Sequence, residues 1–307
     1  MEKDFHYYLI FSLAAITKQD KPDIIAYASQ FVDDNNEEQF SISGEKVDFP
    51  NKIKASGGHY YPIMTQSMSP LSLDIFVQKY VYVPFHFLPG DDTVEIKGKR
   101  NKLNTTPNSQ NAQIVLSEAL ASDNPYRLGI ALHTFADTWS HQNFTGLREE
   151  WNSVYPWYSV KKYLVPDIGH AEAGHSPDVI SEVWTDHRFN QQIVNVDRAF
   201  DAVREIYRNL QKNSRQGPNW GDVRLKYLKI LRVQNYDDRT KTIVDFTKNE
   251  VHIDIPKYDE QQWIKAALDK TGEEAEMAND FEQTHWHQFH LAAKAQLALV
   301  LSLISEL

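Results

Sequence analysis

The segment HTFADTWSH places His133, Asp137 and His141 at intervals of four residues within an otherwise apolar stretch. Because side chains four apart lie on one face of an α-helix, these three residues are expected to share a face. His and Asp are common zinc ligands, but His133 and His141 would lie about 12 Å apart along the helix, too far to bind one ion together. The spacing therefore predicts two metal ions that share Asp137. The alternative is a set of buried polar residues that hydrogen-bond to neighbouring helices.

Other residues that could complete such a site occur in the N-terminal part of the chain. They are His6, Asp33, Asp34, His86, His170 and Glu172. Imidazole and carboxylate groups hold zinc at hydrolytic sites, although each residue taken singly also fits a structural role, such as a core histidine or a helix-end carboxylate. Two choices stay open: His59 is an alternative to His86, and Asp178 is an alternative to Glu172.

The composition restricts the classes of protein and partner. The 307-residue chain has 41% hydrophobic and 24% charged residues, which is typical of a folded globular protein. It has no cysteine, so disulfides, thiolate nucleophiles and thiolate zinc sites are excluded. The net charge of −10 disfavours a long nucleic acid as partner, because such binding depends on Lys and Arg contacts to phosphates.

The sequence predicts neither a cleaved signal peptide nor a transmembrane segment. Asp4 and His6 interrupt the N-terminal apolar run where the hydrophobic region of a signal peptide would begin. The most apolar C-terminal window, HLAAKAQLALVLSLI, is interrupted by Lys294 and Gln296. We expect a cytoplasmic protein, or one exported without a recognisable signal peptide.

Helical periodicity predicts the elements that must position these candidate ligands. Helices are predicted at about 3–18, 22–34, 70–82, 125–144, 196–212, 220–232, 258–270 and 275–305, with another ending near 121. A further helix is predicted to begin with Ser176 as its N-cap and Pro177 at its first position. TIVDF and VHIDI, on either side of Lys248 and Asn249, predict a β-hairpin. No repeat or linker divides the chain, so residues 1–307 are predicted to form one all-α domain.

The order of the candidate ligands resembles that of zinc-dependent phospholipase C and the S1/P1 nucleases. The resemblance covers residues 1–178 and rests on His6, the pair Asp33 and Asp34, a loop histidine, the H-x-x-x-D pattern with a following histidine, and a later histidine near a carboxylate. The phrases YASQFVDDN, FHFLPGD, HTFADTWSHQNF and IGHAEAG also resemble a related bacterial family of unassigned function. The resemblance implies an all-α fold with a cluster of three zinc ions.

Transferred to this chain, the resemblance implies three sets of ligands. One zinc would be held by Asp33, His86, His133 and Asp137, a second by His141, His170 and Glu172, and a third by His6 with Asp137. The spacing differs, because His141 follows Asp137 by four positions instead of six, and Glu172 follows His170 by two instead of four. The chain also begins MEKDFH, without the processed N-terminal tryptophan that holds the third zinc in that superfamily. Two zinc ions are therefore expected.

The implied activity is that of a zinc-dependent phosphoester hydrolase similar to phospholipase C, with a small phosphoester or a phospholipid as substrate. Zinc supplies hydroxide at neutral pH and stabilises the charge that develops at phosphorus. Asp33 or Asp34, whichever does not bind metal, is expected to orient the attacking water as the catalytic carboxylate.

Two other classes of protein stay open. One is a non-catalytic metal-binding protein on the same scaffold, for which the altered ligand spacing would be the signature. The other is a di-iron carboxylate protein, suggested by the E-x-x-H segments Glu172–His175 and Glu282–His285. The segment HWHQFH, which contains His285, His287 and His290, is predicted to be a solvent-exposed helix face.

Overall fold

The computed structural model describes residues 1–36, 55–56, 59–60, 62–67, 70–155, 159–160, 164–268 and 278–304. Helix accounts for 58% of the structure and strand for 6%, so the predicted mainly helical class is confirmed. No helix within these ranges is both long and apolar enough to cross a membrane.

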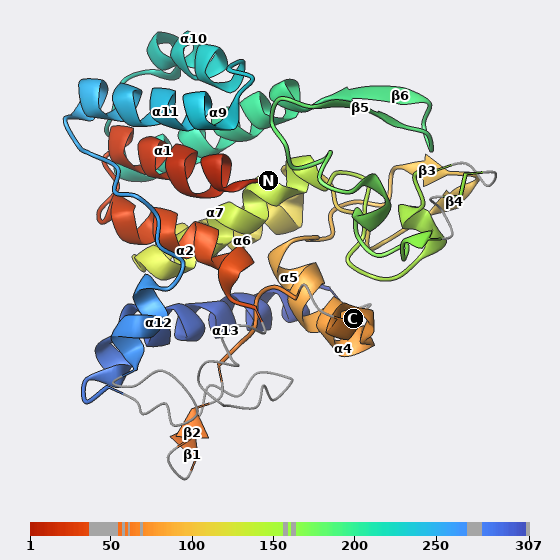
Figure 1. The fold of residues 1–307 in the computed structure, drawn as a ribbon, viewed down its shortest axis with the longest axis horizontal. Coiled ribbons are helices and arrows are strands. Elements are labelled where there is room, and N and C mark those ends of the chain that lie inside the picture. The colour runs from red at the N-terminus through yellow and green to blue at the C-terminus, as the bar shows by residue number, and fades with distance from the viewer. Residues whose placement is uncertain are drawn as a thin grey trace.

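Helix α7, Pro125–Ser140, lies in the middle of the molecule (Figure 1). The side chain of Asn124 caps it by accepting the N–H groups of Tyr126 and Arg127, and every residue from Leu128 onward is buried. Four other helices pack around α7: α2 (Pro22–Asp34), α6 (Gln110–Ala121), α9 (Asn195–Ser214) and α13 (His285–Leu303). Polar side chains on α7 are therefore enclosed by other helices.

Helices α2 and α7 approach each other closely at Gly129. A Cβ atom at this position would lie 2.4 Å from the carbonyl oxygen of Ile25 and 2.6 Å from the Cβ of Ala28, so a larger residue does not fit. The close packing brings the end of α2, which carries Asp33, next to the face of α7 that carries His133.

The N-terminal segment is buried beside α2 and α7. A π-helical stretch, Asp4–Leu9 (η1), leads into α1, Ile10–Ile16, and nearly all of these residues are buried. Asp4 forms a buried ion pair with Arg239 of α11, Tyr236–Val251. The helices predicted at 3–18 and 22–34 are confirmed, and the N-terminus lies next to α7 (Figure 1).

The other elements are shorter or lie farther from α7. The helical ones are η2 (Pro70–Leu73), α4 (Ile75–Val77), η3 (Gln78–Tyr82), α5 (Val83–Phe85), η4 (Glu150–Asn152), η5 (Ala171–Ala173), α10 (Trp220–Leu231), α12 (Gln262–Ala267) and η6 (Phe281–Gln283). Within the described ranges the strands form three antiparallel pairs: β1 (Ala55–Ser56) with β2 (His59–Tyr60), β3 (Glu95–Ile96) with β4 (Lys99–Arg100), and β5 (Val183–Asp186) with β6 (Gln191–Val194).

Several predicted helix boundaries need correction. The helix predicted at 70–82 is divided among η2, α4 and η3, and the one predicted at 125–144 ends at Ser140, because His141 leaves the helical conformation. The last long helix begins only at His285, where the hydroxyl of Thr284 accepts the N–H of His287 as an N-cap. Residues 275–277, the start of the predicted range, lie outside the described part of the chain.

The hairpin predicted around Lys248 and Asn249 is wrong. TIVDF lies inside α11, and the described chain has no strand at VHIDI. Asn235 caps α11 by accepting the N–H of Asp238, and the buried residues Arg239, Ile243 and Thr247 are spaced four apart on one face. Burial of this face against the rest of the fold outweighs the strand preference of the β-branched residues.

The helix predicted to start at Ser176 is also wrong. This segment forms turns that lead into the β5–β6 hairpin. The side-chain amide of Asn195 donates to the carbonyl oxygens of Ser176 and Val179 at 2.6 and 2.8 Å, which fixes the turn from a distance along the chain. A hydrogen bond of this kind leaves no signal in the local sequence.

Candidate metal centre

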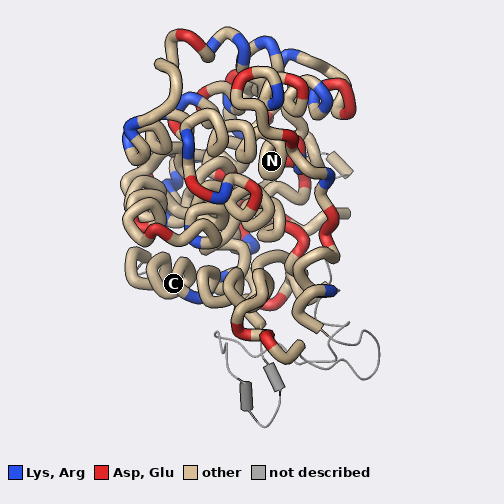
Figure 2. Tube along the Cα trace, turned by 90° about the vertical axis from the view of Figure 1, so that its left-hand side faces the viewer, with Lys and Arg blue, Asp and Glu red and all other residues tan. Residues whose placement is uncertain are grey.

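Candidate ligands from separate segments converge beside α7. α7 carries His133 and Asp137, and His141 follows at its C-terminal end, while the other ligands come from η1, from the end of α2, from the residue after α5 and from the segment around η5. Their ligand atoms form three groups, within each of which all atoms lie within 4.8 Å of one another: Asp33, His86 and His133; His141, His170 and Asp178; and His6, His133 and Asp137. The N-terminus, labelled in Figure 2, lies at this cluster, where it contacts Asp137 and Asp178.

The group around His86 and His133 has separations that suit one tetrahedral ion. Nδ1 of His86 lies 3.2 Å from Nε2 of His133, and Oδ2 of Asp137 lies 3.2 and 3.1 Å from these two nitrogens. Oδ1 of Asp33 lies 3.9 and 3.7 Å from the same nitrogens. A zinc ion with bonds of about 2.0–2.1 Å places tetrahedral ligand atoms about 3.4 Å apart. The structure therefore brings together the four residues that the sequence resemblance assigns to one zinc.

The second group consists of His141, His170 and Asp178. Oδ1 of Asp178 lies 3.1 Å from Nε2 of His141, and its Oδ2 lies 3.2 Å from Nε2 of His170. Asp178 thus occupies the carboxylate position that the resemblance gives to Glu172. Of the two carboxylates left open by the sequence, the geometry favours Asp178.

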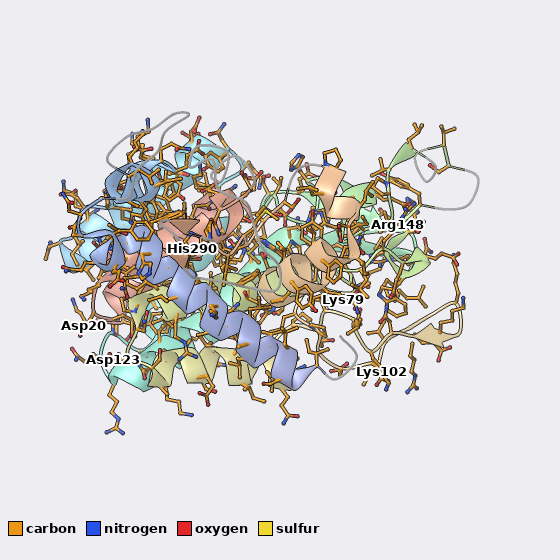
Figure 3. All side chains as sticks on the ribbon, turned by 90° about the horizontal axis from the view of Figure 1, so that it is seen from below. Asp20, Lys79, Lys102, Asp123, Arg148 and His290 are labelled. Atoms are coloured by element: carbon orange, nitrogen blue, oxygen red, sulfur yellow. The ribbon has the colours of Figure 1, made fainter. Side chains whose placement is uncertain are left out.

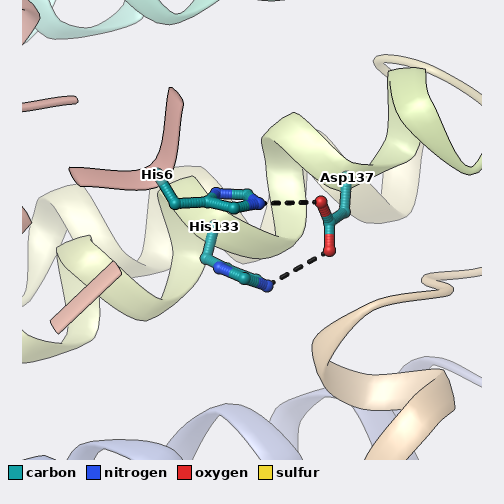
Figure 4. Close-up of side chains that lie close together, drawn as sticks. All are labelled: His6, His133 and Asp137. Atoms are coloured by element: carbon teal, nitrogen blue, oxygen red, sulfur yellow. Dashed lines mark hydrogen bonds and ion pairs between the residues drawn. The ribbon is translucent and has the colours of Figure 1, made fainter. Parts of the chain in front are cut away.

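The third group contains His6, His133 and Asp137 (Figure 4). Nε2 of His6 lies 3.1 Å from Oδ1 of Asp137, and the rings of His6 and His133 stack with centroids 3.8 Å apart. The α-amino nitrogen of Met1 also reaches this place, 2.7 Å from Oδ1 of Asp137 and 3.1 Å from Oδ1 of Asp178. Burial opposes protonation of this amino group, but Asp137 and Asp178 outweigh it and raise its pKa to about 11, so a cation lies next to the third group.

Asp137 connects the groups through both of its carboxylate oxygens. Oδ1 faces the Met1 amino group and His6, whereas Oδ2 faces His86 and His133. Burial tends to raise the pKa of this carboxyl, but the surrounding imidazole and amino groups outweigh it and hold the pKa well below its ordinary value. Asp137 is therefore ionised, which is the form that binds a cation.

Burial shifts the pKa values of three neighbouring candidate ligands. Burial raises the pKa of Asp33 to about 7, with His133 opposing the shift and Asp137 reinforcing it. Burial lowers the pKa of His6 well below its ordinary value and also lowers the pKa of His170. Because neutral imidazole is the form that binds metal, both histidines are available ligands at pH 7.

Backbone carbonyl groups determine which ring nitrogen of three histidines faces the cluster. Nε2 of His86 lies 2.9 Å from the oxygen of Thr65, Nδ1 of His141 lies 2.8 Å from the oxygen of His86, and Nδ1 of His170 lies 2.9 Å from the oxygen of Gly174. A carbonyl oxygen only accepts hydrogen bonds, so each of these nitrogens carries the proton. The other ring nitrogen then presents its lone pair to the cluster, as in established metal sites.

The cluster opens onto a cavity of about 930 Å³. Ligands from the first two groups line its wall, and so do Tyr82, Phe87 and Tyr236. The volume lies within the range of small-molecule sites, and aromatic walls with a few polar groups are typical of them. The ligands that line the cavity are therefore accessible to a bound small molecule.

Asp34 lies in this cavity but belongs to none of the three groups. Its Oδ2 accepts hydrogen bonds from the hydroxyl of Tyr258 at 2.6 Å and from Nε2 of Gln30 at 3.2 Å. Burial raises the pKa of Asp34 above its ordinary value, and the hydrogen bonds from Tyr258 and Gln30 oppose this shift. Of the two carboxylates predicted to orient water, Asp33 lies with the ligands and Asp34 lies beside them.

The structure does not bring Glu172 to the cluster. The hydroxyl of Ser153 donates to Oε1 of Glu172 at 3.0 Å, and the N–H of Tyr155 donates to Oε2 at 3.3 Å. These contacts tie the segment after η4 to η5. The geometry therefore gives Glu172 a structural role in place of the predicted metal-ligand role.

The E-x-x-H segments and the HWHQFH segment do not form a second cluster. Among the described residues, neither Glu172 nor Glu282 belongs to a ligand group. His285 is exposed, whereas His290 is fully buried and its Nδ1 accepts the N–H of Ile63 at 3.1 Å. The predicted exposed face is therefore wrong for His290.

The sequence left the choice between His59 and His86 open, and it did not predict that the Met1 amino group lies at the cluster. His59 lies in β2 and its side chain lies outside the described part of the chain, while His86 occupies a ligand position. The Met1 amino group was not among the predicted ligands. The sequence contains one indication of this position, because Met1 precedes the candidate ligand His6 by only about one and a half helical turns.

The fold and the cluster define a mainly helical protein with a candidate centre for more than one metal ion. The chain belongs to a family of unknown function, DUF6765, and the match to that family covers residues 1–304. It matches no curated protein and no solved structure. The family covers every candidate ligand but assigns no activity to them.

Proposed function

We propose that this protein is a zinc-dependent phosphoester hydrolase related to zinc-dependent phospholipase C and the S1/P1 nucleases. The observation that carries the proposal is the set of ligand atoms around His86 and His133, whose separations of 3.1 to 3.9 Å suit one ion and which shares His133 and Asp137 with the group of His6. The order of the ligands along the chain and the mainly helical fold support the relation to that superfamily.

The donor set fits zinc. Every candidate ligand offers an imidazole nitrogen or a carboxylate oxygen, and Nδ1 of His86 lies 3.2 Å from Nε2 of His133. Such an approach is favourable when a cation lies between the two nitrogens. We place one zinc ion with these histidines and a second with His141, His170 and Asp178. Zinc held there would supply a Lewis acid and a water with a pKa near 7.

Asp34 would act as the catalytic base. As the oxygen of a water molecule bonds to phosphorus and the bond to the leaving group breaks, the carboxylate of Asp34 would take the proton of that water. Tyr258 and Gln30 both donate to Oδ2 of Asp34, so they would hold its carboxylate in one orientation toward the cavity.

The proposed substrate is a small phosphoester or a phospholipid. The cavity of about 930 Å³ accepts a headgroup-sized molecule, and its aromatic residues offer apolar contacts. The net charge of −10 disfavours binding of a long polyanion, so extended nucleic acid is the less favoured substrate.

Metal content and turnover test the proposal together. We expect two zinc ions per chain by elemental analysis of purified protein, and hydrolysis of bis(4-nitrophenyl) phosphate that chelation abolishes and added zinc restores. Two iron ions with near-ultraviolet absorption would instead support the di-iron class. Bound zinc without turnover on phosphomonoesters, phosphodiesters, phospholipids or single-stranded nucleic acid would support a non-catalytic metal-binding protein.

A further inference from the structure

We propose that α13 positions His86 for metal binding through two buried polar side chains, His290 and Gln296. The inference rests on the proposed metal centre and extends it, because neither residue is a ligand and both lie in the C-terminal helix, far from the ligands in sequence. Each hydrogen-bonds to a different backbone segment, and the two segments meet at the His86 ring.

The inner face of α13 is otherwise apolar. His290 and Gln296 are 0% and 3% exposed, among buried residues such as Phe289, Ala293 and Leu297. Figure 3 shows His290 on α13, and Asp20 lies at the edge of the molecule in the same view. Buried polar side chains on such a face are stable only when they are hydrogen-bonded. The hydrogen-bond partners of His290 and Gln296 therefore show which backbone segments these side chains position.

Gln296 holds the chain immediately before His86. Its Nε2 donates to the carbonyl oxygen of Pro84 at 3.1 Å and to Oγ1 of Thr134 at 2.8 Å. Oγ1 of Thr134 in turn donates to the carbonyl oxygen of Phe85 at 2.8 Å. Because Thr134 follows His133 in α7, this network fixes the backbone of one ligand relative to the backbone of the other.

His290 holds the segment on the other side of the His86 ring. Its Nδ1 accepts the N–H of Ile63 at 3.1 Å. Burial lowers the pKa of His290 to about 3, so the ring is neutral and keeps an acceptor nitrogen. Ile63 lies two residues before Thr65, whose carbonyl oxygen lies 2.9 Å from Nε2 of His86.

The two contacts together define the tautomer and the orientation of His86. The hydrogen bond from Nε2 to the Thr65 carbonyl leaves Nδ1 as the nitrogen that faces Asp137 and His133. Gln296 holds the backbone next to His86, which donates this hydrogen bond, and His290 holds the backbone near Thr65, which accepts it. Loss of partners that orient a ligand typically lowers metal affinity about 10- to 100-fold.

Three variants and a control test this role. Gln296→Leu and His290→Leu remove the two contacts, whereas His290→Asn keeps an acceptor for the N–H of Ile63. Leu297→Ala alters a buried neighbour on α13 whose side chain makes no hydrogen bond. For each protein we would record nitrogen-15 spectra of the metal-free histidine rings, zinc affinity by competition with a chelator, and thermal unfolding.

We expect metal-free wild-type protein to show His86 protonated at Nε2. Gln296→Leu and His290→Leu should lose this single tautomer and bind the zinc of the His86 group about 10- to 100-fold more weakly, while the ion at His170 is retained. His290→Asn should restore both readouts. Leu297→Ala should unfold at a lower temperature with both readouts unchanged.

The possible failures are distinguishable. An unchanged tautomer in folded Gln296→Leu and His290→Leu, or an equal loss of zinc affinity in Leu297→Ala, would overturn the positioning role. If wild-type protein binds no zinc but the tautomer still depends on Gln296 and His290, the proposed function fails and the positioning of His86 stands. If Gln296→Leu does not fold, the comparison of His290→Leu with His290→Asn decides the question.

Discussion

His133 and Asp137 meet one helical turn apart on α7, with Nε2 of the histidine 3.1 Å from Oδ2 of the aspartate. Their side chains are 0% and 1% exposed, so this polar face is turned into the protein. A buried carboxylate is stable only with compensating charge or hydrogen bonds, and segments distant in sequence supply these contacts. The following predictions depend on this arrangement.

Asp137→Ala should release more metal than His141→Ala. Asp137 contacts ligands of both proposed ions, because its Oδ2 lies 3.2 Å from Nδ1 of His86 and 3.7 Å from Nδ1 of His141, whereas His141 contributes to the group of His170 and Asp178. We expect His141→Ala to keep the ion near His86 and Asp137→Ala to lose most of both ions, measured by elemental analysis after gel filtration. Equal and independent losses in the two variants would argue against a shared aspartate.

Asp178→Asn should lose about one metal ion, whereas Glu172→Gln should lose none. Asp178 lies 3.1 and 3.2 Å from two histidine nitrogens, and Glu172 instead accepts hydrogen bonds from Ser153 and Tyr155. A neutral amide is a weaker zinc ligand than a carboxylate. The measurement is zinc content at equal protein concentration. The reverse pattern would return the ligand role to Glu172.

Asp34→Asn should lower kcat for phosphodiester hydrolysis about 10²- to 10⁴-fold with the metal content unchanged. The amide cannot take the proton of water, and Asp34 belongs to no ligand group. Asp20→Asn, at an exposed position, serves as the matched control and should retain full activity. Loss of zinc from Asp34→Asn would show that this carboxylate is a ligand and not the base.

To bind the carboxylate of Asp33, zinc must displace its proton. The contribution of this one group should therefore increase zinc affinity about tenfold per pH unit from pH 5 to 7. The folded protein raises the pKa of Asp33 from 3.8 to about 7. The same shift stabilises the metal-free protein below pH 4, and this contribution is lost as the pH rises to about 7. Chelator competition from pH 5 to 8 measures the affinity. Asp33→Asn should bind zinc weakly and without this pH dependence.

Arg239→Met should lower the free energy of unfolding by about 3–5 kcal/mol, because it leaves the buried carboxylate of Asp4 without its cation. Arg208→Met, at an exposed ion pair with Glu205, should cost no more than about 1 kcal/mol. Urea unfolding of both variants provides the comparison. Similar losses in both variants would show that the buried pair does not anchor the N-terminal segment.

Local sequence signals predict the main helices around the site. Pro22 and Asp23 predict the start of α2, and Asn124 with Pro125 predicts the start of α7, because caps and first-turn residues act on the adjacent backbone. The same local reasoning failed for α11, where β-branched residues suggest strands. The burial of Arg239, Ile243 and Thr247 against the rest of the fold decided for a helix there.

The sequence also determined that His133 and Asp137 share a face, since the helical period fixes that relation within a few residues. The three-dimensional structure was needed to show that Asp178 faces His170, that Glu172 binds Ser153 and that the Met1 amino group reaches Asp137. These relations depend on how turns and helices distant in sequence pack together. Local spacing carries no information about such packing, because one spacing is compatible with many arrangements of the loops.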